Sequence, residues 1–178
     1  MGKSSLATEP QNLVQQPLYS DAERERRDRS PWTLVQGILA PVQLLAFIVS
    51  LILVLRYLST GSGETAATVS ILVKTALLYS IMVTGCLWER DVFGRFLFAR
   101  PFFWEDVVSI AVIALHTAYL YALLTGALAV RDQMLLALLA YSAYLANATQ
   151  FLLKLRAARL EGRQLPGQET GVLAGARP

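Results

Sequence analysis

Four apolar segments dominate the pattern of hydrophobic and polar positions along the chain, at about residues 34–58, 65–88, 103–128 and 133–153. An α-helix rises about 1.5 Å per residue, so each segment can cross a hydrocarbon core of about 30 Å. A bilayer offers no water to the backbone, and each segment should therefore be helical. The pattern predicts an all-α fold class: a polytopic membrane protein with a bundle of four transmembrane helices.

The flanking regions are polar. Residues 1–30 carry no sustained apolar period, which predicts an N-terminal tail with a short helix at "DAERERRD". They lack the short apolar core of a cleavable signal peptide, so the first apolar segment should stay in the membrane as an anchor. Residues 31–160 are then the four-helix transmembrane domain. Residues 161–178 are rich in Gly and Pro and are predicted to be a disordered C-terminal tail.

Composition supports the membrane assignment and excludes several function classes. The chain is 54% hydrophobic and 16% charged, whereas a soluble domain carries about 25% charged residues. Its net charge of +3 is too small and too scattered for a nucleic-acid interface. The single cysteine, Cys86, excludes an intrachain disulfide, and the single histidine, His116, excludes a multi-histidine metal site. No Walker, zincin or nucleophile-elbow motif occurs.

Basic residues predict the orientation. They gather before the first segment, between the second and third, and after the fourth: Arg24, Arg26, Arg27, Arg29; Arg90, Arg95, Arg100; Lys154, Arg156, Arg159, Arg163. With four spans, these three regions lie on one side of the membrane, and the positive-inside rule makes that side cytoplasmic. Both termini are therefore expected in the cytoplasm.

Four ionisable residues stand inside the apolar segments: Lys74, Glu105, Asp106 and His116, with Gln36, Gln43, Asn147 and Gln150 as weaker polar members. An ionisable group at the centre of a span costs about 2.5–3.5 kcal/mol to insert, so such groups tend to face the bundle interior and to be functional. Glu105 and His116 share a helix face, with His116 about 16 Å deeper. Lys74 is expected near the depth of His116. The set predicts a polar funnel that opens to the cytoplasm.

Each of these residues also has a purely structural interpretation. Glu105 and Asp106 can stabilise the start of a helix, where the dipole favours acids. Lys74 can pair with a carboxylate or carbonyl to join helices, and His116 can be an interhelical hydrogen-bonding group. Asn147 and Gln150 can be polar contacts of the kind that hold membrane helices together.

The segments "SPWTLVQGILAPVQ", "VKTALLYSIMVTG", "FFWEDVVS", "IALHTAYL" and "NATQFLLKLRAARLE" resemble the 3-vinyl (bacterio)chlorophyllide hydratase family of photosynthetic bacteria, over about residues 19–161. The resemblance implies a lyase of bacteriochlorophyll biosynthesis that adds water to the 3-vinyl group of chlorophyllide, giving a 1-hydroxyethyl group. It implies no cofactor, because the substrate carries its own magnesium. It also implies a multi-pass protein of the bacterial inner or intracytoplasmic photosynthetic membrane, in contact with lipids. Other enzymes of the pathway and a second copy of the chain are further partners to consider.

Hydration of a vinyl group requires an acid to protonate the terminal carbon and a base or amide to aim the water. We expect Glu105 and Asp106 to be the acid and base, and Asn147 and Gln150 to orient the water. His116 is either an axial ligand to the substrate magnesium or an acid/base partner. Lys74 or Arg100 is expected to hold the propionate, in one of two opposite pigment orientations.

Two other functions remain open from the sequence. A non-enzymatic pigment-binding or assembly factor would need His116 and apolar walls, but not both carboxylates. A proton or ion conduit would use the ionisable residues, although four spans without an internal repeat do not favour a transporter.

Overall fold

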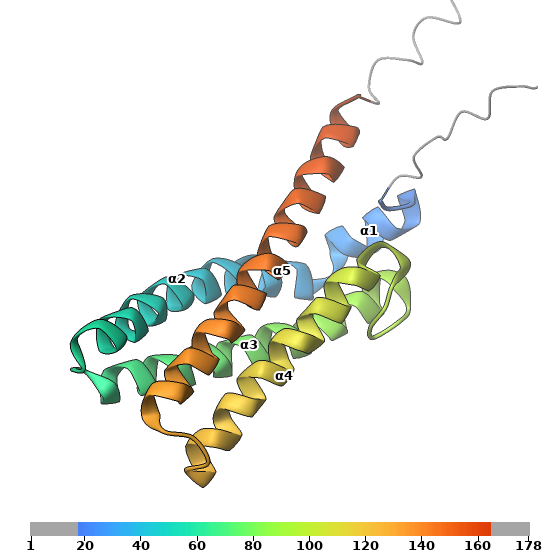
Figure 1. Cartoon of the computed structure of the whole chain (residues 1–178). Coiled ribbons are helices and arrows are strands. Elements are labelled where there is room, and N and C mark those ends of the chain that lie inside the picture. The colour runs from blue at the N-terminus through green and yellow to red at the C-terminus, as the bar shows by residue number, and fades with distance from the viewer. Residues whose placement is uncertain (1–17, 165–178) are drawn as a thin grey trace, which may run out of the picture.

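The computed structural model describes residues 18–164, with side chains described as far as Lys154 and at Arg156. The helices are α1 (Asp21–Arg29), α2 (Pro31–Thr60), α3 (Glu64–Phe93), η1 (Arg100–Phe102, a 3₁₀ turn), α4 (Phe103–Thr125) and α5 (Val130–Gln164) (Figure 1). No strand occurs in this part of the chain, so the all-α prediction is confirmed. Most of the two predicted tails, residues 1–17 and 165–178, lies outside the described residues.

Helices α2 to α5 correspond to the four predicted spans, and each contains a stretch long and apolar enough to cross a membrane. Most of their ends differ from the prediction by five residues or fewer, whereas α5 continues eleven residues beyond the expected end at 153. Helix α3 continues to Phe93, beyond the expected end at 88, and stops where Gly94 adopts a left-handed conformation with φ of 74°. Helix α4 stops at Thr125 because Gly126 is left-handed with φ of 65°, and α5 extends to Gln164.

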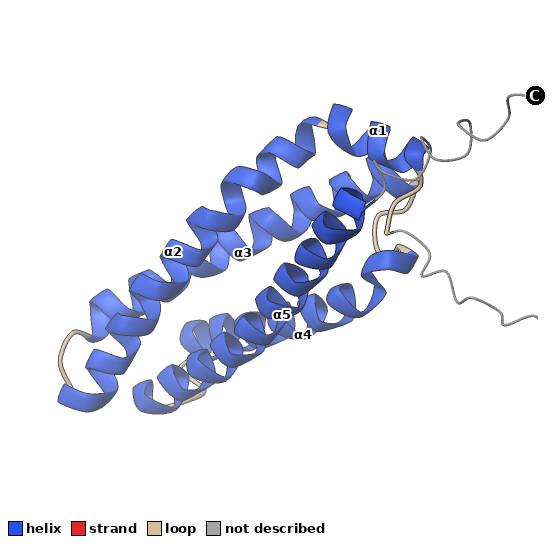
Figure 2. Cartoon of the chain, turned by 90° about the horizontal axis from the view of Figure 1, so that it is seen from above, coloured by secondary structure: helices blue, strands red, loops and turns tan. Residues whose placement is uncertain are grey.

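The spans form two antiparallel hairpins that lie side by side (Figures 1 and 2). Helices α2 and α3 make one hairpin and have the most extensive contact of any pair, followed by α4 and α5 in the other. The three-residue link of the first hairpin, residues 61–63, has two glycines with positive φ, Gly61 at 71° and Gly63 at 89°. Glycine populates this region without the steric cost that other residues incur, so the sequence "GSG" permits the tight reversal.

The core lies where α2, α4 and α5 turn one face toward α3 and toward each other. On α2 the buried residues are Gln43, Phe47, Ser50 and Val54, which recur every three or four positions and therefore form one stripe. Large apolar side chains such as Leu34, Leu45 and Ile52 are exposed on the other faces of α2. Without a bilayer such exposure would be unfavourable, and it is the surface expected of a helix in contact with lipid tails.

The last part of the predicted N-terminal tail folds onto the end of α3. The short helix predicted at "DAERERRD" is present as α1. Arg26 Nε donates a hydrogen bond of 2.7 Å to the carbonyl oxygen of Val92, and the ring of Tyr19 stacks on Phe93 at 5.8 Å. Burial raises the pKa of the Tyr19 hydroxyl to about 12, so this side chain stays neutral in its apolar contact. Helix α1 therefore covers the end of the first hairpin near the site.

Candidate functional site

A lysine and a histidine meet in the interior of the bundle. Lys74 Nζ on α3 lies 2.9 Å from His116 Nε2 on α4, and both residues are buried. His116 Nδ1 lies 2.8 Å from the carbonyl oxygen of Val112. That carbonyl can only accept, so Nδ1 carries the hydrogen and Nε2 accepts from the Lys74 ammonium. The predicted equal depth of Lys74 and His116 is confirmed by this contact, which also joins the two hairpins.

Aromatic rings of α5 surround the ammonium. Lys74 Nζ lies 4.3 Å from the ring centre of Tyr144 and 5.0 Å from that of Tyr141, within the range of cation–π attraction. The Tyr141 hydroxyl is hydrogen-bonded to Ser50 of α2, whose hydroxyl also lies 2.8 Å from Ser70 of α3. Residues from all four spans therefore contribute to one buried polar cluster.

The charge of Lys74 has no carboxylate partner in the described part of the chain, where no acidic oxygen lies within 4.0 Å of its Nζ. Its exposed fraction is 0%. A buried charge is normally paired or heavily hydrogen-bonded because its desolvation is expensive. A neutral imidazole and two aromatic faces compensate the charge only in part. The position therefore suits an anionic group brought by a ligand.

Glu105 is held in an ion pair that sequence reasoning did not predict. Its two carboxylate oxygens each lie 2.7 Å from Lys154 Nζ of α5. The Lys154 ammonium also donates to the carbonyl oxygen of Pro101. Glu105 is buried, and the pair joins the first turn of α4 to α5 in the second hairpin. This contact fixes the position of the Glu105 side chain.

Asp106 faces Glu89 of α3 rather than Glu105. Both residues are buried. They also accept hydrogen bonds from consecutive backbone amides of the α3–α4 connection. Phe98 N donates to Asp106 at 2.6 Å, and Ala99 N donates to Glu89 at 3.2 Å. Two close carboxyls in one site favour a shared proton, because like charges cannot both be ionised cheaply.

The connection that supplies these amides has an unusual backbone. Phe98 has φ of 60°, and in the described part of the chain it is the one non-glycine residue with positive φ. For a bulky residue this conformation is uncommon and carries a cost of about 1–3 kcal/mol. The hydrogen bond from Phe98 N to Asp106 offsets part of that cost. The carboxyl pair and the strained connection therefore hold each other in place.

Two amides occupy the interior between the carboxyls and the lysine–histidine pair. Asn147 Nδ2 on α5 donates to Ser109 Oγ on α4 at 2.8 Å. Asn147 Oδ1 is buried and makes no hydrogen bond with any described group. Gln43 on α2 is 2% exposed, and neither atom of its amide has a partner in the described chain. Buried polar atoms are normally hydrogen-bonded, so these atoms require an explanation.

The remaining predicted residues lie apart from this cluster. Gln150 is exposed on α5, and Arg100 is exposed in η1 at the end of the α3–α4 connection. Gln36 donates to Thr84 Oγ1 at 2.7 Å and to the carbonyl oxygen of Ile81 at 3.1 Å, so its amide joins α2 to α3. The structure thus brings Lys74 together with His116, whereas at the start of α4 Glu105 meets Lys154 and Asp106 meets Glu89.

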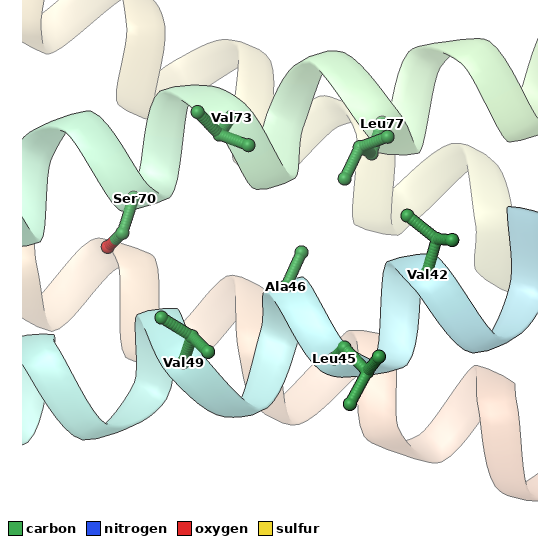
Figure 3. Close-up of a pocket in the computed structure, with 7 residues that line it drawn as sticks. All are labelled: Val42, Leu45, Ala46, Val49, Ser70, Val73 and Leu77. Carbon is green, nitrogen blue, oxygen red and sulfur yellow. The ribbon is translucent and has the colours of Figure 1, made fainter.

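An apolar groove of about 410 Å³ runs along the first hairpin (Figure 3). It lies between α2 and α3 and is lined by Val42, Leu45, Ala46, Val49, Ser70, Val73 and Leu77. Ser70 is the polar member, and its hydroxyl contacts Ser50 of the buried cluster. None of the lining residues is ionisable, so the groove itself offers apolar contact rather than acid or base chemistry.

Neither nitrogen of His116 is free for a metal in this arrangement, because Val112 and Lys74 engage both. Among the residues with described placement, no three His, Cys, Asp or Glu side chains gather closely enough to hold a metal ion. Ligation of a magnesium ion carried by the substrate would require Lys74 to leave Nε2. The ligand role of His116 therefore stays a prediction.

Sequence reasoning missed two ionisable members of the site. Glu89 directly follows Trp88, where the apolar pattern of the second span ends. The pattern therefore predicts that Glu89 lies outside the span, in the connection to the third. Lys154 was counted only as an orienting charge. A signal for Lys154 exists, because the third and fourth spans are antiparallel, and Glu105 at the start of one and Lys154 at the end of the other lie at the same end of the hairpin, where opposite charges can meet.

The comparisons with known proteins agree on one family. The profile described as 2-vinyl bacteriochlorophyllide hydratase (BCHF) matches residues 19–157. A protein of Rhodobacter capsulatus named 2-vinyl bacteriochlorophyllide hydratase is 59% identical over 168 residues, which cover 94% of this chain and 96% of the relative. A protein of Cereibacter sphaeroides with the same name is 63% identical over 144 residues, 81% of this chain and 89% of the relative. No solved structure matches the chain.

Proposed function

Since the chain belongs to the 2-vinyl bacteriochlorophyllide hydratase family, we propose that it adds water to the vinyl group of a bacteriochlorophyllide or chlorophyllide. The product carries a 1-hydroxyethyl group in place of the vinyl group. The observation that carries the proposal is the family match over residues 19–157, which covers all four apolar spans. The vinyl-bearing carbon is numbered 2 in this family name and 3 in the name used in the sequence analysis. Both names describe hydration of a vinyl substituent.

The reaction has two chemical requirements. The hydroxyl group ends on the carbon next to the macrocycle, so a proton must first add to the terminal CH₂, and the macrocycle stabilises the resulting cation. Water then forms the carbon–oxygen bond and releases one proton. An acid that keeps its proton inside an apolar site meets the first requirement, and positioned acid–base groups of this kind contribute about 10²–10⁴ in rate.

Asp106, together with Glu89, is the proposed acid. The two residues are buried and accept hydrogen bonds from consecutive backbone amides, and close carboxyls in such a site favour one shared proton. Glu105, the preceding residue of α4, is engaged by Lys154 and is not part of this pair. After the proton is transferred, the conjugate carboxylate accepts the proton that the adding water releases. The enzyme returns to its initial state.

Lys74 is the proposed site for the substrate's propionate. The ammonium is buried, lacks a carboxylate partner in the described chain, and lies among Tyr144, Tyr141 and His116. A propionate at Lys74 directs the other end of the pigment toward the carboxyls. Val112 and His116 are respectively seven and eleven residues beyond Glu105 on α4, which is about 10 and 16 Å along the helix. His116 is proposed to orient the Lys74 ammonium or, if Lys74 moves onto the propionate, to approach the substrate magnesium.

The proposed location is the inner or intracytoplasmic membrane of a photosynthetic bacterium, with both termini in the cytoplasm. The distribution of arginines and lysines supports this orientation. In this orientation the carboxyl pair lies near the cytoplasmic surface, where water and a chlorophyllide without its hydrocarbon tail are available.

Expression of the chain in a non-photosynthetic host that is supplied with vinyl chlorophyllide tests the function. The host makes no bacteriochlorophyll, so any conversion depends on the added chain. We expect a product heavier than the substrate by one water molecule, separated by chromatography and identified by mass spectrometry. Membranes that bind the pigment but never convert it would contradict the proposal and would indicate a pigment-binding or assembly factor instead.

A further inference from the structure

The two amides with unpartnered atoms, Gln43 and Asn147, face the same layer of the bundle interior. The contacts between α2 and α5 form successive rungs. Ser50 is hydrogen-bonded to Tyr141, and the ring of Phe47 lies 5.1 Å from that of Tyr144. The helices are antiparallel, so the helical repeat is expected to bring Gln43, one turn from Phe47 on α2, to the level of Asn147 and Ala148, one turn from Tyr144 on α5.

This layer borders both parts of the site. On its deep side, one turn of α5 separates Asn147 from Tyr144, whose ring contacts the Lys74 ammonium. On its cytoplasmic side, the Ser109 hydroxyl that accepts from Asn147 is three residues from Asp106 on α4, again about one turn. A ligand in this layer therefore lies between the proposed acid and the proposed propionate site.

The unpartnered atoms define what the layer can bind. Gln43 presents one amide oxygen and one NH₂ group, and Asn147 presents one amide oxygen. A small molecule that donates two hydrogen bonds satisfies both oxygens. Water does so, and buried water normally makes two to four hydrogen bonds with groups of this kind. Amide oxygens are weak bases, so they hold water without deprotonating it.

We infer that Gln43 and Asn147 bind the water molecule that adds to the vinyl group. The inference rests on the proposed hydration and deepens it. Water that donates both hydrogens to the two amide oxygens keeps an oxygen lone pair free to attack the cation. The water oxygen forms the carbon–oxygen bond, and the released proton passes to the Asp106–Glu89 carboxylate that protonated the terminal carbon. Gln43 and Asn147 hold the nucleophile, whereas Lys74 binds the pigment through its propionate.

The first test separates binding of the water from binding of the pigment. In the purified chain, Gln43→Leu removes the amide and keeps the volume. We expect kcat to fall by about 100-fold, the usual cost of misplacing a reacting group. We expect the Kd for pigment, measured by absorbance titration, to stay within about twofold, because the inferred role of the amide is to hold water rather than pigment. Gln36→Leu is the matched control on the same helix, since the Gln36 amide is already hydrogen-bonded to α3.

The second test uses a different nucleophile. Gln43→Ala enlarges the layer and should admit methanol, whose addition to the cation gives a 1-methoxyethyl product that is heavier than the normal product by one CH₂ group. Wild type and Gln36→Ala should give only the hydroxyl product in the same methanol-containing buffer. A merely structural glutamine would not alter the choice of nucleophile.

The outcomes distinguish this inference from the proposed function. A wild-type chain without hydration activity defeats the proposed function. If the wild type is active, three results overturn the assignment of the water site alone. The Gln43 variants keep kcat, they lose pigment affinity in step with activity, or they form no methyl ether. If the Gln43 variants do not fold, Asn147→Leu is measured in the same way, with the exposed Gln150→Leu as its control. The same split between kcat and Kd is then expected.

Discussion

Breaking the ion pair between Glu105 and Lys154 should destabilise the second hairpin, and the losses from changing the two residues should not be additive. The charged atoms are 2.7 Å apart, and the side chains are 11% and 26% exposed. Removal of one partner of a fully buried pair costs about 3–5 kcal/mol, because the other charge is left uncompensated. Lys154 retains some contact with solvent, so we expect Lys154→Met to cost about 2–3 kcal/mol, less than for a fully buried pair.

A double-mutant cycle measures this coupling. Unfolding of Glu105→Gln, Lys154→Met and the combined variant is followed in mixed micelles by far-UV circular dichroism as a denaturing detergent is added. The combined variant should lose no more stability than Lys154→Met alone, because neither charge is then stranded. Arg156→Met, an exposed change on the same helix, should stay within about 0.5 kcal/mol of wild type. Strictly additive losses for Glu105 and Lys154 would refute the assignment of a buried pair.

Three further predictions concern the chemistry. Asp106→Asn and Glu89→Gln should each abolish turnover and leave pigment binding intact; full turnover in both variants would remove the carboxyl pair as the acid. Lys74→Met should weaken binding of the free-acid pigment by about 30-fold, which is about 2 kcal/mol for a lost buried charge pair, and should leave the propionate methyl ester almost unaffected. Equal losses for acid and ester would place the propionate elsewhere. His116→Ala should shift the absorption of bound pigment if His116 is a magnesium ligand, and an unchanged spectrum would exclude that role.

The sequence predicts the fold well because a bilayer leaves few choices. Four apolar segments of sufficient length must be helices, and short connections make consecutive helices antiparallel. The depth of a side chain then follows from the rise per residue alone. This is why Lys74 could be placed near the depth of His116, and the structure shows their nitrogens 2.9 Å apart.

The rotation of each helix about its axis is not fixed by the same argument. Asn147 and Gln150 differ by three residues and seem equivalent in the sequence, yet Asn147 reaches Ser109 while Gln150 is exposed. The neighbour that a side chain faces depends on how the helices pack. For the same reason, the sequence alone does not show that Asp106 lies next to Glu89. Helix ends are equally hard to place from polarity, so Glu89 was assigned to a connection although α3 continues to Phe93.

The central claim is that this chain, by itself, hydrates a vinyl group within its four spans. The most direct test reconstitutes the purified chain in lipid nanodiscs with vinyl chlorophyllide in ¹⁸O-labelled water. The account predicts a 1-hydroxyethyl product whose hydroxyl oxygen carries the label, formed by the wild type and absent with Asp106→Asn. Unlabelled product, or the same labelled yield from nanodiscs without the chain, would contradict it.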